Sequence, residues 1–274
     1  MRAADHAYLS DPTPLALAHR GGSLLPANVG LENTRAAFAR AVALGYRYLE
    51  TDVHATRDGQ VVAFHDTVLD RVTDARGAVA DLTWDEVCVA RVGGTEPVPL
   101  LGDLLEAFPT TRFNIDVKAD AALEPTVAVL REHDALDRVC LGSFSPRRIR
   151  ALRRALGPRV ATAAGQVGTA ALRFSPALLA RMLHTPAPVL QIPAVHHVAG
   201  RSLVLVTPGL VRRAHDLGKQ VHVWFHDGRR EDAAEFHRLL DLGVDGLVAD
   251  RIDVLADVLA QRGSPLLPQA GGLL

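Results

Sequence analysis

Strand-like and helix-like segments alternate along most of this chain, and this alternation restricts its fold more than any other feature. Eight apolar runs have the composition and length of buried strands, and they span residues 15–19, 46–53, 112–118, 138–141, 159–163, 189–192, 220–224 and 246–249. Eight β/α units in about 250 residues are typical of a TIM barrel. A doubly wound sheet would also alternate, but no Gly-x-Gly-x-x-Gly sequence follows the first run. The sequence therefore predicts an α/β fold, a (β/α)8 TIM barrel.

Helix-like runs separate the strands, and they cover residues 33–44, 100–108, 121–133, 146–156, 176–183, 208–217, 230–242 and 252–261. The first turn of a helix tolerates proline, which suits Pro146, Pro176 and Pro208. Glycine commonly follows the last turn, which suits Gly218 and Gly243.

One barrel domain over residues 13–262 accounts for this pattern, with residues 1–12 and 263–274 as terminal extensions. Residues 66–99 interrupt the alternation with a segment rich in Asp, Arg, Gly and Thr. We interpret this segment as a small insertion after the second strand. Within it, Thr83 and Glu86 have the spacing of a capping box, which predicts a short helix.

The composition excludes several classes of function. A formal net charge of −1 over 274 residues argues against a protein that binds nucleic acid or attaches to membranes through a basic surface. The two cysteines form no disulfide framework, and the first twelve residues contain no apolar signal-peptide core. No apolar run approaches the roughly 20 residues that a membrane span requires. We expect a cytoplasmic protein without an integral membrane segment, whose partner is a small molecule; its oligomeric state stays open.

Two carboxylates lie two positions apart in the second strand, at Glu50 and Asp52. Side chains alternate along a strand, so these two point to the same side and repel each other. A divalent cation that prefers oxygen ligands would remove this conflict. The alternative is an exposed strand face that carries two unrelated acids.

A histidine is expected beside these acids. The Asp58-Gly59 pair is a hairpin signal between two β-rich runs, 46–53 and 61–65. Counting outward equally from this turn places Asp52 opposite His65, and cross-strand partners lie within about 5 Å.

Other polar side chains stand where strands end, at the face that carries active sites in TIM barrels. They are His19, Arg20, Asp116, Lys118 and Trp224. A third carboxylate would complete a cation site, and Arg20 offers a planar donor fork for phosphate. The alternatives are a histidine that only fills the core, an ion pair of Arg20 with Glu32, and an interior ion pair of Asp116 with Lys118. Trp224 suits a core position and a wall for a sugar or glycerol equally.

Further candidates carry weaker signals. We interpret His196 and His197 as a loop pair, because no carboxylate lies at useful spacing. We assign no role to His226 or Asp227. Asp245 and Asp250 flank the last strand and are expected to cap neighbouring elements.

In combination, these motifs closely resemble the glycerophosphodiester phosphodiesterase family. The resemblance rests on residues 19–21, 32–34, 50–53, 56–59 and 65–66, and extends through 79–87, 116–118, 221–224 and 243–246. The family more often has Glu where Asp116 stands, Pro where Leu31 stands and Thr where Phe225 stands. The first difference bears on the third metal ligand and the last on the alcohol pocket, but neither removes a catalytic group.

The resemblance implies a metal-dependent phosphodiesterase that hydrolyses glycerophosphodiesters to glycerol 3-phosphate and an alcohol. His19 and His65 would be the general acid–base pair, in an order that stays open, and Glu50, Asp52 and Asp116 would bind Mg or Ca. Arg20, Lys118, Trp224 and Glu32 would form the substrate-binding and phosphate-binding group. Attack by water or by a substrate hydroxyl, which forms a cyclic phosphate first, stays open as well. The alternatives are a lysophospholipase D for longer lipids and a non-catalytic barrel that binds phosphodiesters.

Overall fold

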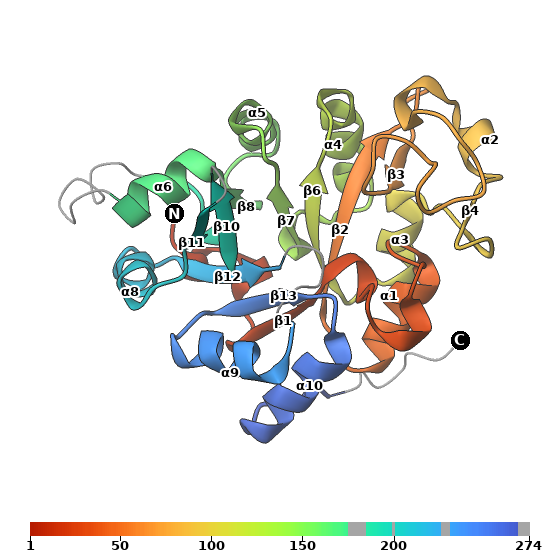
Figure 1. Cartoon of the computed structure of the whole chain (residues 1–274). Helices are drawn as coiled ribbons and strands as arrows, with labels where there is room; N and C mark the ends of the chain where they lie inside the picture. Colours follow the sequence, from red (N-terminus) through yellow and green to blue (C-terminus); the bar gives the residue numbers. More distant parts are fainter. Residues whose placement is uncertain (175–184, 199–200, 226–230, 268–274) are drawn as a thin grey trace.

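The computed structural model of the chain describes residues 1–174, 185–198, 201–225 and 231–267. Within these ranges, parallel strands close into a barrel (Figure 1), which confirms the predicted fold. The barrel strands are β1 (Leu15–Ala18), β2 (Tyr48–Ala55), β6 (Arg112–Val117), β7 (Val139–Gly142), β8 (Ala161–Ala164), β9 (Val189–Pro193), β12 (Gln220–Trp224) and β13 (Gly246–Ala249). Closure follows from β1, which pairs in parallel with both β2 and β13.

Helices surround the barrel at most of the predicted positions. They are α1 (Arg35–Ala43), α3 (Leu101–Ala107), α4 (Leu123–Glu132), α5 (Pro146–Leu156), α6 (Gln166–Phe174), α8 (Pro208–Asp216), α9 (Ala233–Asp241) and α10 (Ile252–Gln261). Pro146 and Pro208 occupy first turns, as predicted, and Ser145 and Thr207 cap these helices by accepting backbone N–H groups. Helix α6 was not predicted, and the helix expected over 176–183 lies outside the described residues.

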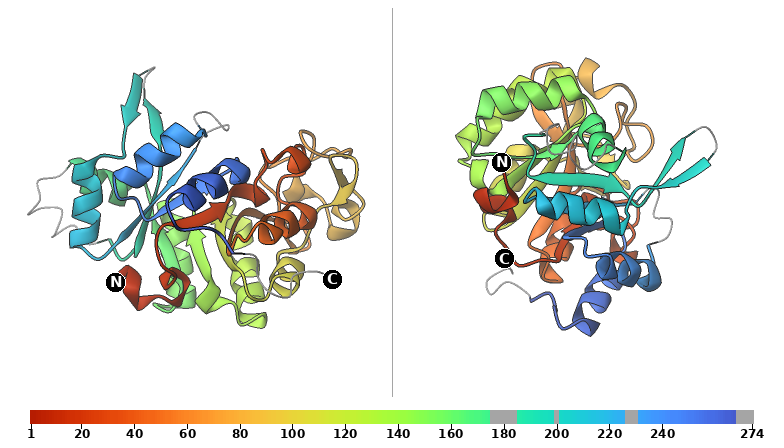
Figure 2. Two further views of the ribbon diagram at one scale, coloured as in Figure 1. Left: turned by 90° about the horizontal axis from the view of Figure 1, so that it is seen from below. Right: turned by 90° about the vertical axis from the view of Figure 1, so that its left-hand side faces the viewer.

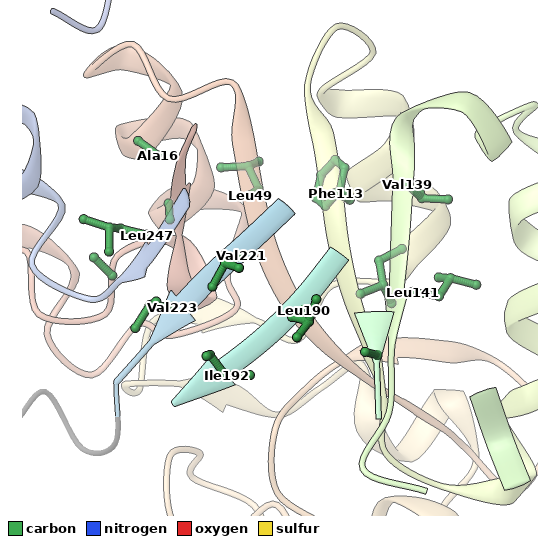
Figure 3. Close-up of a cluster of buried hydrophobic side chains, with 14 of the residues drawn as sticks. Ala16, Leu49, Phe113, Val139, Leu141, Leu190, Ile192, Val221, Val223 and Leu247 are labelled. Carbon is green, nitrogen blue, oxygen red and sulfur yellow. The ribbon is translucent and has the colours of Figure 1, made fainter. Parts of the chain in front are cut away.

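Strand residues that face outward form the main hydrophobic core with the helices (Figure 3). Alternate residues point to opposite faces of a strand, so one set faces the helices and the other faces the barrel interior. The outward set includes Ala16, Leu49, Phe113, Val139, Leu141, Leu190, Ile192, Val221, Val223 and Leu247, all buried. The inward set makes a second cluster that includes Leu15, Leu17, Tyr48, Cys140, Ala161, Ala163, Val189 and Val248.

The N-terminal segment, predicted as a terminal extension, belongs to this second cluster. Tyr8 and Leu9 are buried, and the Tyr8 ring meets the Tyr48 ring edge-on at 5.2 Å between centroids. Tyr48 also donates a hydrogen bond from its hydroxyl to the carbonyl oxygen of Tyr8, at 2.8 Å. Because Tyr48 opens β2, the segment covers the amino-terminal end of the barrel. The predicted boundary at residue 13 therefore separates residues that share one core.

The hairpin after β2 has a different register from the predicted one. Strand β3 (Val61–Ala63) runs antiparallel to β2, with Val53 opposite Ala63, and the Phe64 N–H donates to the Asp52 carbonyl at 2.9 Å. Asp52 therefore lies opposite Phe64, and the prediction of His65 was wrong by one residue. The turn is centred on Asp58, because Thr56 N–H donates to the carbonyl of Gln60.

The insertion has a small core of its own beside β2 and β3 (Figures 1 and 2). It contains α2 (Trp84–Val87), β4 (Arg91–Val92) and β5 (Glu96–Pro97), and Thr83 caps α2 with Glu86, as predicted. Its buried cluster comprises Val62, Phe64, Leu69, Val79, Val87, Ala90, Val92 and Val98.

A second hairpin projects from the barrel after β9 (Figure 2). Strands β10 (Val195–Val198) and β11 (Arg201–Val204) pair antiparallel, so the backbones of His196 and His197 belong to a strand. The loop interpretation of this pair was wrong. In the part of the chain that the structure describes, no helix is both long and apolar enough to cross a membrane.

Candidate active site

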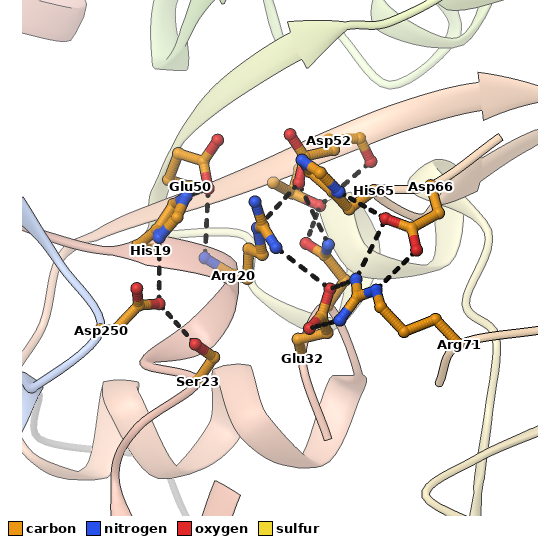
Figure 4. A network of polar contacts seen from close by, with 12 residues as sticks. His19, Arg20, Ser23, Glu32, Glu50, Asp52, His65, Asp66, Arg71 and Asp250 are labelled. Atoms are coloured by element: carbon orange, nitrogen blue, oxygen red, sulfur yellow. Dashed lines mark hydrogen bonds and ion pairs between the residues drawn. The ribbon is translucent and has the colours of Figure 1, made fainter. Parts of the chain in front are cut away.

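Polar side chains from the ends of β1 and β2 and from the hairpin return gather at the carboxyl-terminal end of the barrel (Figure 4), and ion pairs join those of Asp116 and Lys118 at the end of β6 to them. The structure brings together eight of the nine predicted site residues through hydrogen bonds, ion pairs and charge interactions, namely His19, Arg20, Glu32, Glu50, Asp52, His65, Asp116 and Lys118. The ninth, Trp224, joins them through Phe144: the two rings meet edge-on at 6.1 Å, and Lys118 Nζ lies 5.7 Å from the Phe144 centroid.

The two carboxylates of β2 are buried side by side. Glu50 is 6% exposed and Asp52 is 2% exposed. Burial and the charge of Asp52 raise the pKa of Glu50 to about 7. Burial alone would also raise the pKa of Asp52, but Lys118 and Arg20 hold it below its usual value. The predicted repulsion between the two acids is therefore present. Nearby positive charges outweigh the effect of burial on the pKa of Asp52 but not on the pKa of Glu50.

A tight turn after β1 aims His19 and Arg20 into the site. Arg20, Gly21 and Gly22 all have positive φ, which glycine adopts without strain. A Cβ at Gly21 would lie 2.9 Å from the Cβ of Ala37, so the turn also requires close packing on α1. This geometry directs the Arg20 backbone N–H at Glu50 Oε2, at 3.1 Å.

His19 is oriented by Asp250, which follows β13. The distance from His19 Nδ1 to Asp250 Oδ1 is 3.0 Å, and Ser23 donates its hydroxyl to the same oxygen. Burial would lower the pKa of His19, but the charges of Asp250 and Glu50 outweigh it and raise the pKa to about 9. Glu231 accepts the backbone N–H of Asp250 at 2.7 Å, and burial raises the pKa of Glu231 to about 7. The expectation that Asp250 only caps a neighbouring element was wrong.

Asp245 has the capping role that was predicted for both aspartates. Its Oδ2 accepts the backbone N–H of Val221 and lies 2.8 Å from His215 Nε2, at the amino-terminal side of β13. The predicted capping role of Asp245 is therefore confirmed.

His65 is oriented by the residue that follows it. The distance from His65 Nδ1 to Asp66 Oδ1 is 2.6 Å, and Arg71 of the insertion donates to both oxygens of Asp66. Arg71 also donates to both oxygens of Glu32, which in turn accepts a hydrogen bond from Arg20 Nη1 at 3.2 Å. The predicted ion pair of Arg20 with Glu32 is present, and a continuous chain links Arg20 to His65 (Figure 4).

Lys118 lies between two carboxylates. Its Nζ is 2.7 Å from Asp52 Oδ1 and 2.7 Å from Asp116 Oδ2, so the predicted pair of Asp116 with Lys118 also exists. The charges of both acids raise the pKa of Lys118 against the opposing effect of burial.

The three predicted metal ligands remain a prediction. Across the described ranges, no three His, Cys, Asp or Glu side chains converge in the way a metal site requires. The donor set nevertheless fits a divalent cation, because Asp116 Oδ1 is buried without a hydrogen-bond partner and the carboxylates of Glu50 and Asp52 are buried on one strand beside it. Carboxylate oxygens are the ligands that Mg²⁺ and Ca²⁺ prefer.

Four further residues contribute to the site without having been predicted to do so, namely Asn33, Asp66, Arg71 and Asp250. Asn33 donates to Asp52 Oδ2 at 3.3 Å and accepts from the hydroxyl of Thr51. Asp250 could have been found, because it follows a barrel strand at its carboxyl end. Arg71 carries no local signal, since only the tertiary contact with Glu32 places it in the site. His226 and Asp227 lie outside the described residues.

The chain is similar to known proteins of one family. Residues 19–254 match the family model described as the glycerophosphoryl diester phosphodiesterase family. The chain is 42% identical to the Mycobacterium tuberculosis protein named "Probable glycerophosphodiester phosphodiesterase 2", over 91% of this chain and 92% of the relative.

Solved structures share the fold. A glycerophosphodiester phosphodiesterase from Agrobacterium tumefaciens has a TM-score of 0.71 at 24% identity and covers 88% of this chain and 98% of its own. A phosphodiesterase from Oleispira antarctica, in complex with the product sn-glycerol-3-phosphate, has a TM-score of 0.72 at 22% identity, covering 90% and 97%. With the family model matched over most of its length, this chain belongs to the glycerophosphoryl diester phosphodiesterase family.

Proposed function

We propose that this enzyme hydrolyses glycerophosphodiesters to glycerol 3-phosphate and an alcohol, with His19 and His65 as its general acid–base pair. The observation that carries the proposal is that each histidine has its Nδ1 engaged by an aspartate, Asp250 or Asp66. Nε2 of each ring is then the nitrogen that exchanges a proton with the reactants. The phosphodiesterase from Oleispira antarctica supports the product, since that protein was solved in complex with the product sn-glycerol-3-phosphate.

Two protons must move in this reaction. One histidine takes the proton of the attacking oxygen, which belongs to water or to a hydroxyl of the substrate's own glycerol. The other histidine donates a proton to the departing alkoxide, which is otherwise a poor leaving group. Arg20 and Lys118 offset the negative charge of the phosphodiester, and the fork of Arg20 suits two phosphate oxygens.

Glu50, Asp52 and Asp116 would hold a divalent cation. When bound, such a cation offsets charge that builds on the phosphate oxygens during displacement. Glu50 and Asp52 are buried, and charge interactions are stronger away from bulk water. Lys118 then balances the remaining charge of Asp52 and Asp116.

Trp224 and Phe144 supply an apolar wall beside the phosphate-binding groups. Phe144 is 56% exposed, so its ring is available to the glycerol or alcohol portion of a substrate. The edge-on contact with Trp224 fixes the orientation of both rings.

The test is release of glycerol 3-phosphate from glycerophosphocholine, with Mg²⁺, Ca²⁺ or a chelator, by wild type and by His19→Ala. We expect release that requires the cation and that the substitution abolishes. Hydrolysis of lysophospholipids in place of glycerophosphocholine would replace this proposal with lysophospholipase D activity. Folded wild-type protein that cleaves neither substrate would overturn the enzymatic assignment in favour of a phosphodiester-binding barrel.

A further inference from the structure

Arg71 connects the insertion to the site, because its side chain donates hydrogen bonds to two acids there. Its Nε and Nη2 donate to Asp66 at 2.6 and 3.1 Å. Its Nη1 and Nη2 donate to Glu32 at 2.9 and 2.7 Å. A planar guanidinium can hold two carboxylates in fixed orientations at once, which an ammonium cannot do.

The two acids that Arg71 holds are themselves the supports of two proposed functional groups. Asp66 engages Nδ1 of His65 at 2.6 Å, and Glu32 accepts from Nη1 of Arg20 at 3.2 Å. We propose that Arg71 is a positioning residue, which sets the orientation of His65 through Asp66 and of Arg20 through Glu32. The inference rests on the proposed phosphodiesterase function of the same site.

Removal of Arg71 would leave two carboxylates facing each other without the cation that they share. Like charges at this separation repel, so Asp66 and Glu32 would rotate apart or Asp66 would take up a proton. The hydrogen bond from Arg71 is the largest of the effects that lower the pKa of Asp66 to about 2. Either change releases His65 from its orientation and loosens Arg20, and small displacements of catalytic groups lower rates by up to about 100-fold.

Anchoring of the insertion is a separate matter, and other residues already provide it. Leu69 is fully buried in the cluster of the insertion, together with Phe64 and Val79. The Arg71 side chain is 48% exposed, and ion pairs with such exposure typically contribute at most about 1 kcal/mol to stability. A purely structural role would therefore appear in the melting temperature rather than in kcat.

The first experiment compares Arg71→Ala with Arg159→Ala in hydrolysis of glycerophosphocholine. Arg159 is a matched control, because it makes two bonds of 2.6 Å to Asp137, is 53% exposed and has no contact with the site. We expect Arg71→Ala to lower kcat by about 10- to 100-fold and to raise KM several-fold. Both variants should melt within a few degrees of wild type.

Arg71→Lys and added guanidinium sharpen the test. Lys should recover only part of the lost kcat, because one ammonium cannot hold both acids in the original geometry. Guanidinium ion, at concentrations well below those that unfold proteins, should raise the activity of Arg71→Ala and leave Arg159→Ala unchanged. In an Asp66→Asn background, Arg71→Ala should cost less than in wild type, since the two changes disturb one network.

The outcomes separate this inference from the proposed function. If wild type hydrolyses no phosphodiester, the proposed function fails. If wild type is active and Arg71→Ala retains its kcat and KM, the positioning role is overturned. The positioning role is equally overturned if Arg71→Ala unfolds while folded Arg71→Lys has wild-type kinetics. A loss of activity that guanidinium restores supports positioning.

Discussion

Two histidine–aspartate pairs serve the site, and they are built in different ways. His19 and Asp250 lie 231 positions apart in the chain, whereas His65 and Asp66 are neighbours. The His19 side chain is 15% exposed and the His65 side chain is 32% exposed. Both have a short contact from Nδ1 to a carboxylate oxygen, so they reach a similar local geometry from different parts of the fold.

The difference lies in what holds each aspartate. Asp250 follows β13, which pairs with β1, so closure of the barrel brings it to His19. Asp66 lies at the start of the insertion, outside the barrel sheet, and depends on Arg71. A rigid sheet thus fixes one pair, while ion pairs fix the other. We expect the buried pair to couple activity to folding stability and the outer pair to affect activity with little change in stability.

The strongest test is whether the two pairs are equal in the reaction despite this difference. His19→Ala and His65→Ala should each lower kcat by about 100- to 10,000-fold, because each removes one proton transfer. Steady-state hydrolysis of glycerophosphocholine measures this effect, and circular dichroism checks that both variants are folded. Near-normal activity in either variant would exclude that histidine from acid–base catalysis.

The pairs should also differ in how they link folding to pH. The pKa of His19 is raised from 6.5 to about 9, so the stability it contributes is complete below pH 6.5 and is lost as pH rises towards 9. Between pH 7 and 9, this loss amounts to about 2 kcal/mol, since each pKa unit corresponds to about 1.4 kcal/mol. Denaturant unfolding with chelator present should show this slope in wild type and a flatter one in His19→Asn.

Asp66 should act at the other end of the pH range. Its pKa is lowered from 3.8 to about 2, mainly by Arg71, so its contribution is present above about pH 4 and is lost towards pH 2. Arg71→Ala should make the free energy of unfolding less dependent on pH in this acidic range only. If His19→Asn or Arg71→Ala changed the pH dependence of stability equally in the acidic and alkaline ranges, the two pairs would not titrate independently.

Replacing each aspartate tests the supports themselves. Asp250→Asn should lower kcat by about 100-fold and Asp66→Asn by about 10-fold, because Asp250 is the more buried counter-charge. Asp245→Asn is the control, since Asp245 pairs with His215 at 2.8 Å at the other end of β13, away from the site. A larger loss for Asp66→Asn would reverse the proposed ranking of the two pairs.

The smallest effect is expected at the aromatic wall, which belongs to neither pair. Phe144→Ala removes a ring 5.7 Å from Lys118 Nζ and 6.1 Å from the Trp224 centroid. Such contacts typically contribute about 0.5–1 kcal/mol, so KM should rise about two- to fivefold with kcat unchanged. The KM and kcat of wild type and Phe144→Ala, compared for glycerophosphodiesters with different alcohols, measure this effect. A fall in kcat would instead place Phe144 among the groups that support the reaction itself.

The sequence predicted most of the fold because the barrel is a repeat of local patterns. Apolar runs bounded by Pro and Gly marked β12, α5 and α10 at their observed limits, and the capping box marked α2. Helix α6 was missed, and Gly165 before it offers no capping side chain as a start signal. The hairpin register was wrong by one residue, since the predicted two-residue turn is replaced by a loop centred on Asp58.

The sequence by itself determined the site groups that stand at strand ends, because side chains at the ends of parallel strands must meet at one end of a closed barrel. Glu50, Asp52 and Lys118 follow from this rule. Only the tertiary structure decided which side chain orients each of these functional groups. Asp250 reaches His19 through pairing of the first and last strands, and Arg71 reaches Glu32 from an insertion without periodic pattern. Contacts between residues so distant in the chain depend on packing in three dimensions, and no local pattern records them.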